Sequence, residues 1–341
     1  MAELIDLVLL GMLAATALRV IFLRDLFAVV MLFGIYSFLS AAIFVSLDAV
    51  DVAFTEASVG AGISTVLMLG TLALTERKEK VTQHKSWLPL LVVITTGGAL
   101  IYGTLDMPPF ANPDNPVHHH VAPRYIEQSP QEVGLPNMVT SVLASYRGFD
   151  TLGETVVVFS AAVGVLSLLG IRRRREPASG LASESDNTGQ ADLSESDPGL
   201  RAHEVLRVIA KLIIPLILLF ALYVQFHGDF GPGGGFQAGV IAAAAFILYA
   251  LVFGIGSGFQ VVSPNVLRWL TPFGVLLYAG VGVLCMLMGG QFLDYNVLAS
   301  DPVHGQHYGI IAIELGVGIT VFAVMLNIFY AFTSQTERVG Q

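Results

Sequence analysis

The chain has 341 residues, of which 54% are hydrophobic and only 13% are charged. Soluble globular proteins carry about 25% charged residues, so this composition excludes an ordinary soluble enzyme, a disordered chain and a secreted disulfide scaffold. It favours a polytopic membrane protein. The single cysteine, Cys285, excludes intrachain disulfides and cysteine-based metal clusters. The 17 Lys and Arg residues are too scattered for a nucleic-acid-binding stripe.

The N-terminus does not resemble a secretory signal peptide, because Glu3 and Asp6 come first and no base precedes Arg19. We therefore interpret the first apolar run as a retained membrane helix. A membrane helix needs about 20 mostly apolar residues. Runs of this length predict an all-α polytopic membrane protein with about nine transmembrane helices, at 4–23, 27–47, 52–75, 87–105, 150–171, 205–226, 236–255, 267–289 and 307–332.

The basic residues predict the orientation of these spans. If the N-terminus lies outside, only Arg124 and Arg147 fall on the outer side. Because Lys and Arg gather in cytoplasmic loops, this pattern predicts an external N-terminus and a cytoplasmic C-terminus. The inner side then holds 15 of the 17 bases: Arg19, Arg24, Arg77, Lys78, Lys80, Lys85, Arg172, Arg173, Arg174, Arg175, Arg201, Arg207, Lys211, Arg268 and Arg338.

Two segments are too polar to cross a membrane. Residues 106–136 are proline-rich and predict an external loop, and residues 137–147 have the pattern of a short interfacial helix on the outer surface. Residues 172–202 begin with four arginines and continue with SGLASESDNTGQADLSESDPG, which is typical of a flexible cytoplasmic linker. This linker divides the chain into a five-helix module and a four-helix module.

The external loop contains the run His118, His119 and His120, which at first sight indicates a metal site. Adjacent side chains on an extended loop point in different directions, so a loop decoration is the favoured interpretation and no metal site is predicted. The chain also lacks a GxSxG elbow, an HExxH motif and a dinucleotide fingerprint. Enzymatic chemistry is therefore not predicted.

Ionisable side chains within a membrane span cost about 2.5–3.5 kcal/mol near the helix centre, so they are candidate functional residues. Glu56 lies inside the third span, and Asp51 lies at its outer end. Gly60 and Gly62 follow on the same helix, where small residues allow close helix packing. The functional interpretation of Glu56 is a proton or cation relay. The alternative is a neutral, hydrogen-bonded acid that serves packing.

Glu154 lies in the outer part of the fifth span, and Gly148 and Gly153 loosen the start of this helix. Arg147 is placed to pair with Asp150 three residues later if the stretch is helical. Acids at a helix N-terminus also favour the positive end of the helix dipole. That simpler explanation fits Asp150 better than Glu154, which lies about one turn deeper.

The last span contains Glu314, for which a direct role and a structural role stay equally open. The segment that joins the sixth and seventh spans reads HGDFGPGGGFQAGV, which cannot continue a regular helix. A tight packing turn is its favoured interpretation, although His227 and Asp229 could titrate near the outer surface. The backbone-shaping residues of this turn are Pro232, Gly233, Gly234, Gly235 and Gly239, the last two forming a GxxxG face.

Three stretches take the prediction further, because together they resemble known domain families. LDAVDVAFTEASVGAG resembles the MbhD (DUF4040) domain, and YRGFDTLGETVVVF resembles the MbhE domain. HGDFGPGGGFQAGVIAAAAFIL, with the later helix containing IELGVG, is similar to the MnhB/MrpB domain. The resemblance implies an MbhD-like domain of three helices, an MbhE-like domain of two, the linker and an MnhB-like domain of four, at 1–82, 83–175, 176–202 and 203–341.

The resemblance implies the MrpB-type component of an Mrp-type multisubunit antiporter, a secondary transporter of the bacterial inner membrane that exchanges cytoplasmic sodium for external protons. Its implied partners are membrane lipid and the A, C, D, E, F and G components of the antiporter, with no cofactor besides the transported Na+ and H+. It also implies that the acids matching Glu56 and Glu154 belong to the ion path. The candidate ion-translocation residues are Glu56, Glu154, Glu314, Asp51, Asp150, His227 and Asp229.

Two other interpretations stay open. The same domains occur in membrane-bound hydrogenases and respiratory complexes, so the chain could be a membrane module of such an ion pump. It could also be a structural scaffold that contributes no residue to the ion path. Neighbouring genes distinguish the first alternative, and glutamine substitutions distinguish the second.

Overall fold

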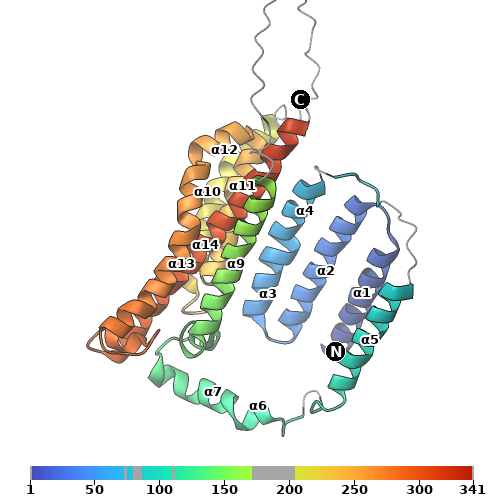
Figure 1. The fold of residues 1–341 in the computed structure, drawn as a ribbon. Helices are drawn as coiled ribbons and strands as arrows, with labels where there is room; N and C mark the ends of the chain where they lie inside the picture. The colour runs from blue at the N-terminus through green and yellow to red at the C-terminus, as the bar shows by residue number, and fades with distance from the viewer. Residues whose placement is uncertain (1, 73–74, 80–86, 110–111, 171–203, 340–341) are drawn as a thin grey trace, which may run out of the picture.

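The computed structural model describes residues 2–72, 75–79, 87–109, 112–170 and 204–339 (Figure 1). The predicted linker at 176–202 lies outside the described residues. The described part is built from helices, apart from one isolated β-bridge between Asp25 and Lys78. Nine of its helices are long and apolar enough to cross a membrane, which confirms the predicted all-α polytopic fold.

The nine membrane-spanning helices alternate in direction along the chain, and the third combines two α-helical pieces with a π-helical turn between them. Their bounds are α1 (Ala2–Phe22), α2 (Leu26–Ser46), α3–η1–α4 (Val50–Glu56, Ala57–Ile63 and Ser64–Leu72), α5 (Trp87–Thr104), α9 (Gly148–Gly170), α10 (Glu204–His227), α11 (Gly235–Phe253), α13 (Pro264–Leu287) and α14 (Pro302–Val339). Short connecting helices are α6 (Pro116–His119), α7 (Val121–Glu132), α8 (Met138–Thr140), η2 (Ser141–Tyr146), α12 (Ile255–Val261) and η5 (Tyr295–Leu298).

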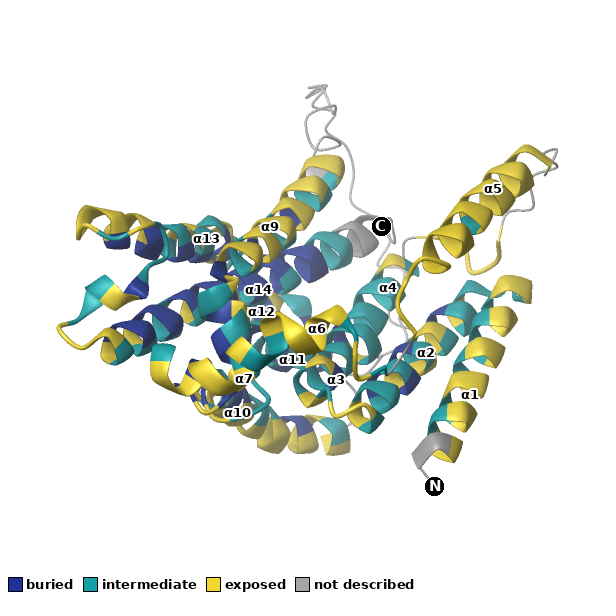
Figure 2. Cartoon of the chain, turned by 90° about the horizontal axis from the view of Figure 1, so that it is seen from below, coloured by how far each residue is buried: buried dark blue, intermediate teal, exposed yellow. Residues whose placement is uncertain are grey.

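The buried core lies around α14, which packs against α9, α11 and α13. Figure 2 shows buried residues concentrated on α11, α13 and α14, whereas α5 is exposed along its length. Within this core Leu267, Ile310, Val321 and Leu326 are completely buried. α14 is therefore the helix that positions the other elements of the C-terminal part of the chain.

Glycines set the close approach of α13 to α14. A Cβ atom added at Gly274 would lie 2.4 Å from the backbone oxygen of Gly316 and 2.3 Å from the hydroxyl of Thr320. In the same way, a Cβ atom added at Gly316 would lie 2.8 Å from the backbone oxygen of Gly274. Small residues at such contacts let two membrane helices approach until their backbones touch.

The spatial grouping of the helices differs from their division along the chain. The helices α1, α2 and α3–α4 form one layer, whereas α9 packs against α13 and α14 (Figure 1). α5 stands apart from α9, although both belong to the predicted second domain. The two helices separate because the connecting segment between them, which includes α6 and α7, runs laterally below the bundle.

The predicted external loop at 106–136 contains more regular structure than expected. It includes α6 and the 12-residue α7, and the segment that follows α7 buries Val133 and Leu135 in the core. Pro123 lies in the first turn of α7, where its missing N–H costs no helical hydrogen bond, whereas Pro130 lies inside the helix and removes one. The proline content of this segment therefore does not exclude a short helix.

Asp25 fixes the start of α2. Its side chain accepts hydrogen bonds from the backbone N–H groups of Phe27 and Ala28, at 3.0 and 3.3 Å, as a helix N-cap does. Arg77, which follows α4 in the chain, donates to the other carboxylate oxygen at 3.0 Å. The Arg77 guanidinium holds the pKa of Asp25 below its ordinary value, so the Asp25 carboxylate keeps its charge at neutral pH.

Substitution of Gly274 by alanine should separate α13 from α14, because the new methyl group would collide with the backbone of Gly316. We expect a loss of about 1–3 kcal/mol in stability, the usual cost of overpacking a tight contact. The thermal midpoint of the detergent-solubilised protein, followed by size-exclusion chromatography, measures it. Gly280→Ala is the matched control on the same helix, since its added Cβ meets nothing within 4 Å in the described chain. Equal midpoints for the two variants would contradict this account.

Candidate functional site: a cavity lined by three carboxylates

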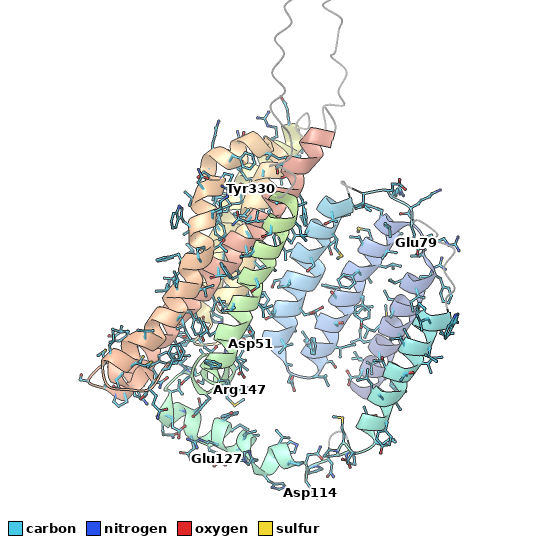
Figure 3. All side chains as sticks on the ribbon, viewed as in Figure 1. Asp51, Glu79, Asp114, Glu127, Arg147 and Tyr330 are labelled. Carbon is cyan, nitrogen blue, oxygen red and sulfur yellow. The ribbon has the colours of Figure 1, made fainter. Side chains whose placement is uncertain are left out.

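A cavity of about 260 Å³ lies where helices of all three predicted domains meet. Asp51, Glu154 and Glu314 line it, from α3, α9 and α14 respectively. It lies toward the lower end of the bundle, where Asp51 is labelled in Figure 3, above Arg147 at the start of α9. The structure thus brings together three of the seven predicted ion-translocation residues.

The Glu314 carboxylate lies against the glycine turn. We define this turn as residues 228–235, from the end of α10 to the first residue of α11. Added Cβ atoms at Gly228 and Gly234 would lie 3.2 Å from the Glu314 carboxylate oxygens. Gly234 also has a φ of +121°, a backbone conformation that favours glycine. The backbone can approach the carboxylate only because these positions carry no side chain.

The start of α11 lies beside the same carboxylate. An added Cβ at Gly235 would come within 1.9 Å of the backbone oxygen of Glu314, so α11 and α14 touch at this point. The first turn of a helix carries free N–H groups and a partial positive charge, which favour a neighbouring anion. Farther along the same contact, a Cβ atom added at Gly239 would lie 2.6 Å from the backbone oxygen of Gly318.

Asp51 and Thr55 connect α3 to the glycine turn. The backbone N–H of Gly233 donates to the Asp51 carboxylate at 3.4 Å. One turn later, the Gln237 side chain of α11 donates to the Thr55 hydroxyl at 2.7 Å. Residues four apart share a helix face, so Asp51 and Thr55 both point at the cavity. Thr55 and Gln237 were not predicted as site residues.

Asn137 and Thr140 hold the glycine turn from below. The Asn137 amide donates to the backbone oxygens of Gly228 and Gly231, at 3.0 and 2.9 Å. The Thr140 hydroxyl donates to the same Gly228 oxygen at 2.6 Å, and the Asn137 backbone N–H donates to the backbone carbonyl oxygen of Asp229 at 3.0 Å. Because these carbonyl groups belong to a turn, they have no helical N–H partner, and the bonds from Asn137 and Thr140 satisfy them instead.

The position of residues 137–147 therefore differs from the predicted interfacial helix. The segment forms α8 and the π-helical η2, and it buries Thr140, Ser141 and Ala144 instead of lying on the surface. Four of its residues line the cavity: Val139, Thr140, Leu143 and Ala144. Its burial follows from the partners that its polar side chains find in the glycine turn.

Glu154 approaches the cavity from α9 and is exposed in this single chain. The neighbouring Tyr278 of α13 is completely buried, and its hydroxyl donates to the Gly148 backbone oxygen at 2.7 Å. Arg147 and Asp150 form the expected ion pair, with 2.5 Å between guanidinium and carboxylate. That pair is exposed and does not line the cavity, so Asp150 lies outside the candidate site.

Glu56 does not line the cavity either, because it points toward α2. An added Cβ at Gly60 would lie 2.7 Å from the Glu56 carboxylate and 2.6 Å from the Ser37 hydroxyl of α2. Each residue of a helix is turned about 100° from the previous one, so Thr55 and Glu56 face different neighbours. The π-helical turn η1 begins directly after Glu56, a feature frequent at functional sites.

Asp229 and His307 form a second polar group near Glu314. The His307 Nδ1 atom lies 3.1 Å from the Asp229 carboxylate, which is buried. Burial raises the pKa of Asp229, and the His307 imidazole opposes this rise. His227 stacks on Tyr223 with 4.8 Å between ring centroids. None of these residues lines the cavity.

The predicted packing glycines fall into two groups. In the first, an added Cβ would meet a neighbour closely, as at Gly148 beside the Tyr295 hydroxyl (3.3 Å) and Gly233 beside the Val224 backbone oxygen (2.6 Å). In the second, Gly62 and Gly153 have room for a side chain in the described chain. Among the described residues, no three His, Cys, Asp or Glu side chains converge as a metal site.

Substitution of Asn137 by alanine should loosen the glycine turn, because the Gly231 carbonyl loses this donor and the Gly228 carbonyl keeps only the Thr140 hydroxyl. Leaving buried polar groups unpaired costs about 1–3 kcal/mol. We expect faster hydrogen–deuterium exchange in peptides that cover 228–238, with little change in α13. Asn265→Ala, at an exposed contact with Arg268, is the control. Unchanged exchange at 228–238 in the Asn137 variant would show that the turn holds its shape without this residue.

Comparison with known proteins accounts for nearly the whole chain. Residues 11–77 match the family MbhD, the D component of MBH, and residues 91–188 match MbhE, the E component of MBH. Residues 205–327 match the domain related to the MnhB subunit of Na+/H+ antiporters. The putative antiporter protein mnhB2 of Staphylococcus aureus (strain Newman) is 33% identical over 132 residues, which cover 38% of this chain and 93% of that protein.

A longer relative, from Rhizobium meliloti (strain 1021), is named as the A/B component of a K(+)/H(+) antiporter. It is 27% identical over 314 residues, which are 86% of this chain and 31% of the relative, so this chain spans about a third of its length.

Two solved structures share the fold. One is the Mrp complex from Dietzia sp. DQ12-45-1b, with a TM-score of 0.70 and 25% identity over 95% of this chain and 34% of that one. The other is the membrane-bound sulfane sulfur reductase (MBS), an archaeal respiratory membrane complex, with a TM-score of 0.50 and 30% identity over 72% of this chain and 97% of that one. The chain therefore belongs to the family of MnhB antiporter subunits, with an MbhD domain and an MbhE domain fused ahead of its MnhB domain.

Proposed function

We propose that this protein is a subunit of an Mrp-type cation/proton antiporter and that its three-carboxylate cavity belongs to the ion path. The single observation that carries this proposal is that Asp51, Glu154 and Glu314, each from a different domain, all line one cavity. Carboxylates are rarely kept within membrane spans unless they pair with one another, face a cavity or bind an ion.

The chemistry of exchange follows from competition for the same oxygens. A carboxylate binds either a proton or a cation, and three carboxylates that share one cavity disfavour full ionisation because like charges repel. A proton that arrives at Glu314 therefore displaces a cation, and a cation displaces a proton. The hydroxyl of Thr55, which also lines the cavity, adds a further oxygen beside the carboxylates.

Sodium is the cation that we propose, in line with the description of the MnhB domain family. Potassium, which stands in the name of the Rhizobium meliloti relative, is the alternative. The two are distinguished by adding each chloride salt to the same vesicles. In both cases the cavity oxygens would be the same, and selectivity would depend on how closely they can converge.

We propose the A, C, D, E, F and G components of the antiporter as partners, and the bacterial cell membrane as the location. Glu154 is exposed in the single chain, and an acid cannot face lipid without cost, so a neighbouring protein of the complex would cover it. Basic residues at the end of the bundle opposite the glycine turn, including Arg24, Arg77 and Arg268, support a cytoplasmic location for that end.

A second candidate function is a membrane module of a redox-driven ion pump, which the similarity to the MBS complex favours. Purification from the native membrane separates the two candidates. Co-purification of antiporter subunits supports the exchange function, whereas co-purification of a metal-containing redox arm supports the alternative.

The test is cation/proton exchange in everted vesicles that contain the complete complex. We expect Glu314→Gln and Asp51→Asn each to lower the exchange rate at least about tenfold, because loss of a positioned proton acceptor commonly costs about 100-fold or more. Glu154→Gln should show a comparable loss. Glu127→Gln, which removes an exposed acid on α7, should leave the rate unchanged.

Glu56→Gln separates the cavity from the α2 contact. Because Glu56 faces Ser37 rather than the cavity, we expect a smaller loss than for Glu314→Gln. Native gels of every variant report assembly. Full exchange by the three cavity variants with intact complexes would refute the proposal, and loss of assembly without a change in specific rate would indicate a purely structural role.

A further inference from the structure

The Glu314 carboxylate has polar neighbours on two sides. On one side lies the cavity with Asp51 and Glu154. On the other side the backbone of Gly228 approaches, since its added Cβ would lie 3.2 Å from Glu314 Oε2, and the next residue is Asp229. Neither Gly228 nor Asp229 lines the cavity. The cavity thus lies on one side of the carboxylate and Asp229 on the other, and we call the side toward Asp229 the second route.

The second route ends in water at His307. Its side chain is 41% exposed, whereas the Asp229 carboxylate that it contacts at 3.1 Å is only 11% exposed. An imidazole is the side chain best suited to exchange protons with water near neutral pH. Burial raises the pKa of Asp229, which brings this acid closer to the range in which it can carry a proton.

The helix register places this pair in line with Glu314. His307 and Glu314 are seven residues apart on α14, so they share a face and lie about 10 Å apart along the axis. The glycine turn crosses that face and carries Asp229 against it. His307, Asp229 and Glu314 therefore follow one another from the surface to the partly buried Glu314 carboxylate.

Other titratable groups on the elements packed around this pair have partners of their own. At the start of α14, Asp301 pairs with His304, and at the end of α10, His227 stacks on Tyr223. Burial and the Glu132 carboxylate raise the pKa of Tyr146 to about 12, so Tyr146 stays neutral. The remaining neighbours with partners are Glu132 (Arg124 and Tyr146), Tyr295 (Ala144 backbone), Tyr278 (Gly148 backbone) and Arg147 (Asp150).

We infer that His307 and Asp229 form a proton relay to Glu314, separate from the cavity that admits the cation; this inference rests on the proposed exchange function. A proton from water binds His307, passes from the imidazolium to the Asp229 carboxylate, and then passes to the Glu314 carboxylate. Glu314 becomes neutral and releases one monovalent cation into the cavity. One proton thus replaces one cation at Glu314, and when a cation binds there again the proton leaves the carboxylate through Asp229 and His307 to water.

The test uses the complete complex in everted vesicles, with the same pH set in the lumen and in the medium, from about pH 6.5 to 9, and exchange measured at saturating and limiting sodium. His307→Asn and Asp229→Asn should lower the rate at saturating sodium about tenfold at alkaline pH, where protons are scarce. The apparent KM for sodium should stay within about twofold, because the cavity is intact. His304→Asn is the matched control, since His304 forms the same kind of pair with Asp301 at 3.3 Å but lies outside this route.

The outcomes separate the relay from the exchange function. A wild-type pH profile in both His307→Asn and Asp229→Asn would overturn the relay, while Glu314→Gln would still report on the cavity. An equal loss in His304→Asn would also overturn it. If Asp229→Asn fails to assemble, His307→Asn decides alone, because this side chain is nearly half exposed. Full exchange by Glu314→Gln would instead refute the proposed function itself.

Discussion

The contact between the glycine turn and α14 is the constraint on which the rest of the structure depends. Backbone lies directly on backbone at Gly235 and Gly239, and only the absence of side chains allows it. This contact fixes where α11 begins, and it places the first turn of α11 beside the Glu314 carboxylate. A turn that must be free of side chains leaves its carbonyl groups without helical partners, so it also requires donors from outside. Asn137 and Thr140 supply them, which draws a distant part of the chain beneath the turn.

The cavity belongs to no single domain. Its carboxylates come from the MbhD domain, the MbhE domain and the MnhB domain, and its floor comes from the segment before α9. α9 packs against α14 rather than against α5, so the MbhE domain is divided in space between a helix that completes the core and a helix that stands outside it. The geometry of such a site depends on the relative positions of three domains. A small shift of one helix therefore changes the distances between the carboxylates.

The spans, the intramembrane acids and the glycine turn could be predicted from the sequence, because they depend on run length, residue type and local backbone chemistry. The partners of the acids could not. Asp51 and Thr55 reach the cavity while Glu56 faces Ser37, a distinction that depends on which neighbours surround α3. The burial of residues 137–147 depends on carbonyl groups about 90 residues later in the chain. His307 looks like an ordinary surface histidine until Asp229 is placed beside it, and no local pattern announces that pairing.

The fusion of the three domains has a consequence for biosynthesis. Because one polypeptide supplies every carboxylate of the cavity, the walls of the site are made in equal numbers by a single round of translation. No surplus of one wall accumulates in the membrane with an acid exposed to lipid. The chain must still wait for its last helix, since Glu314 follows the glycine turn and both come after the other walls in chain order. Until α14 inserts, the earlier helices hold Asp51 and Glu154 without the backbone contact with α14, so the cavity is complete only after this helix has been made.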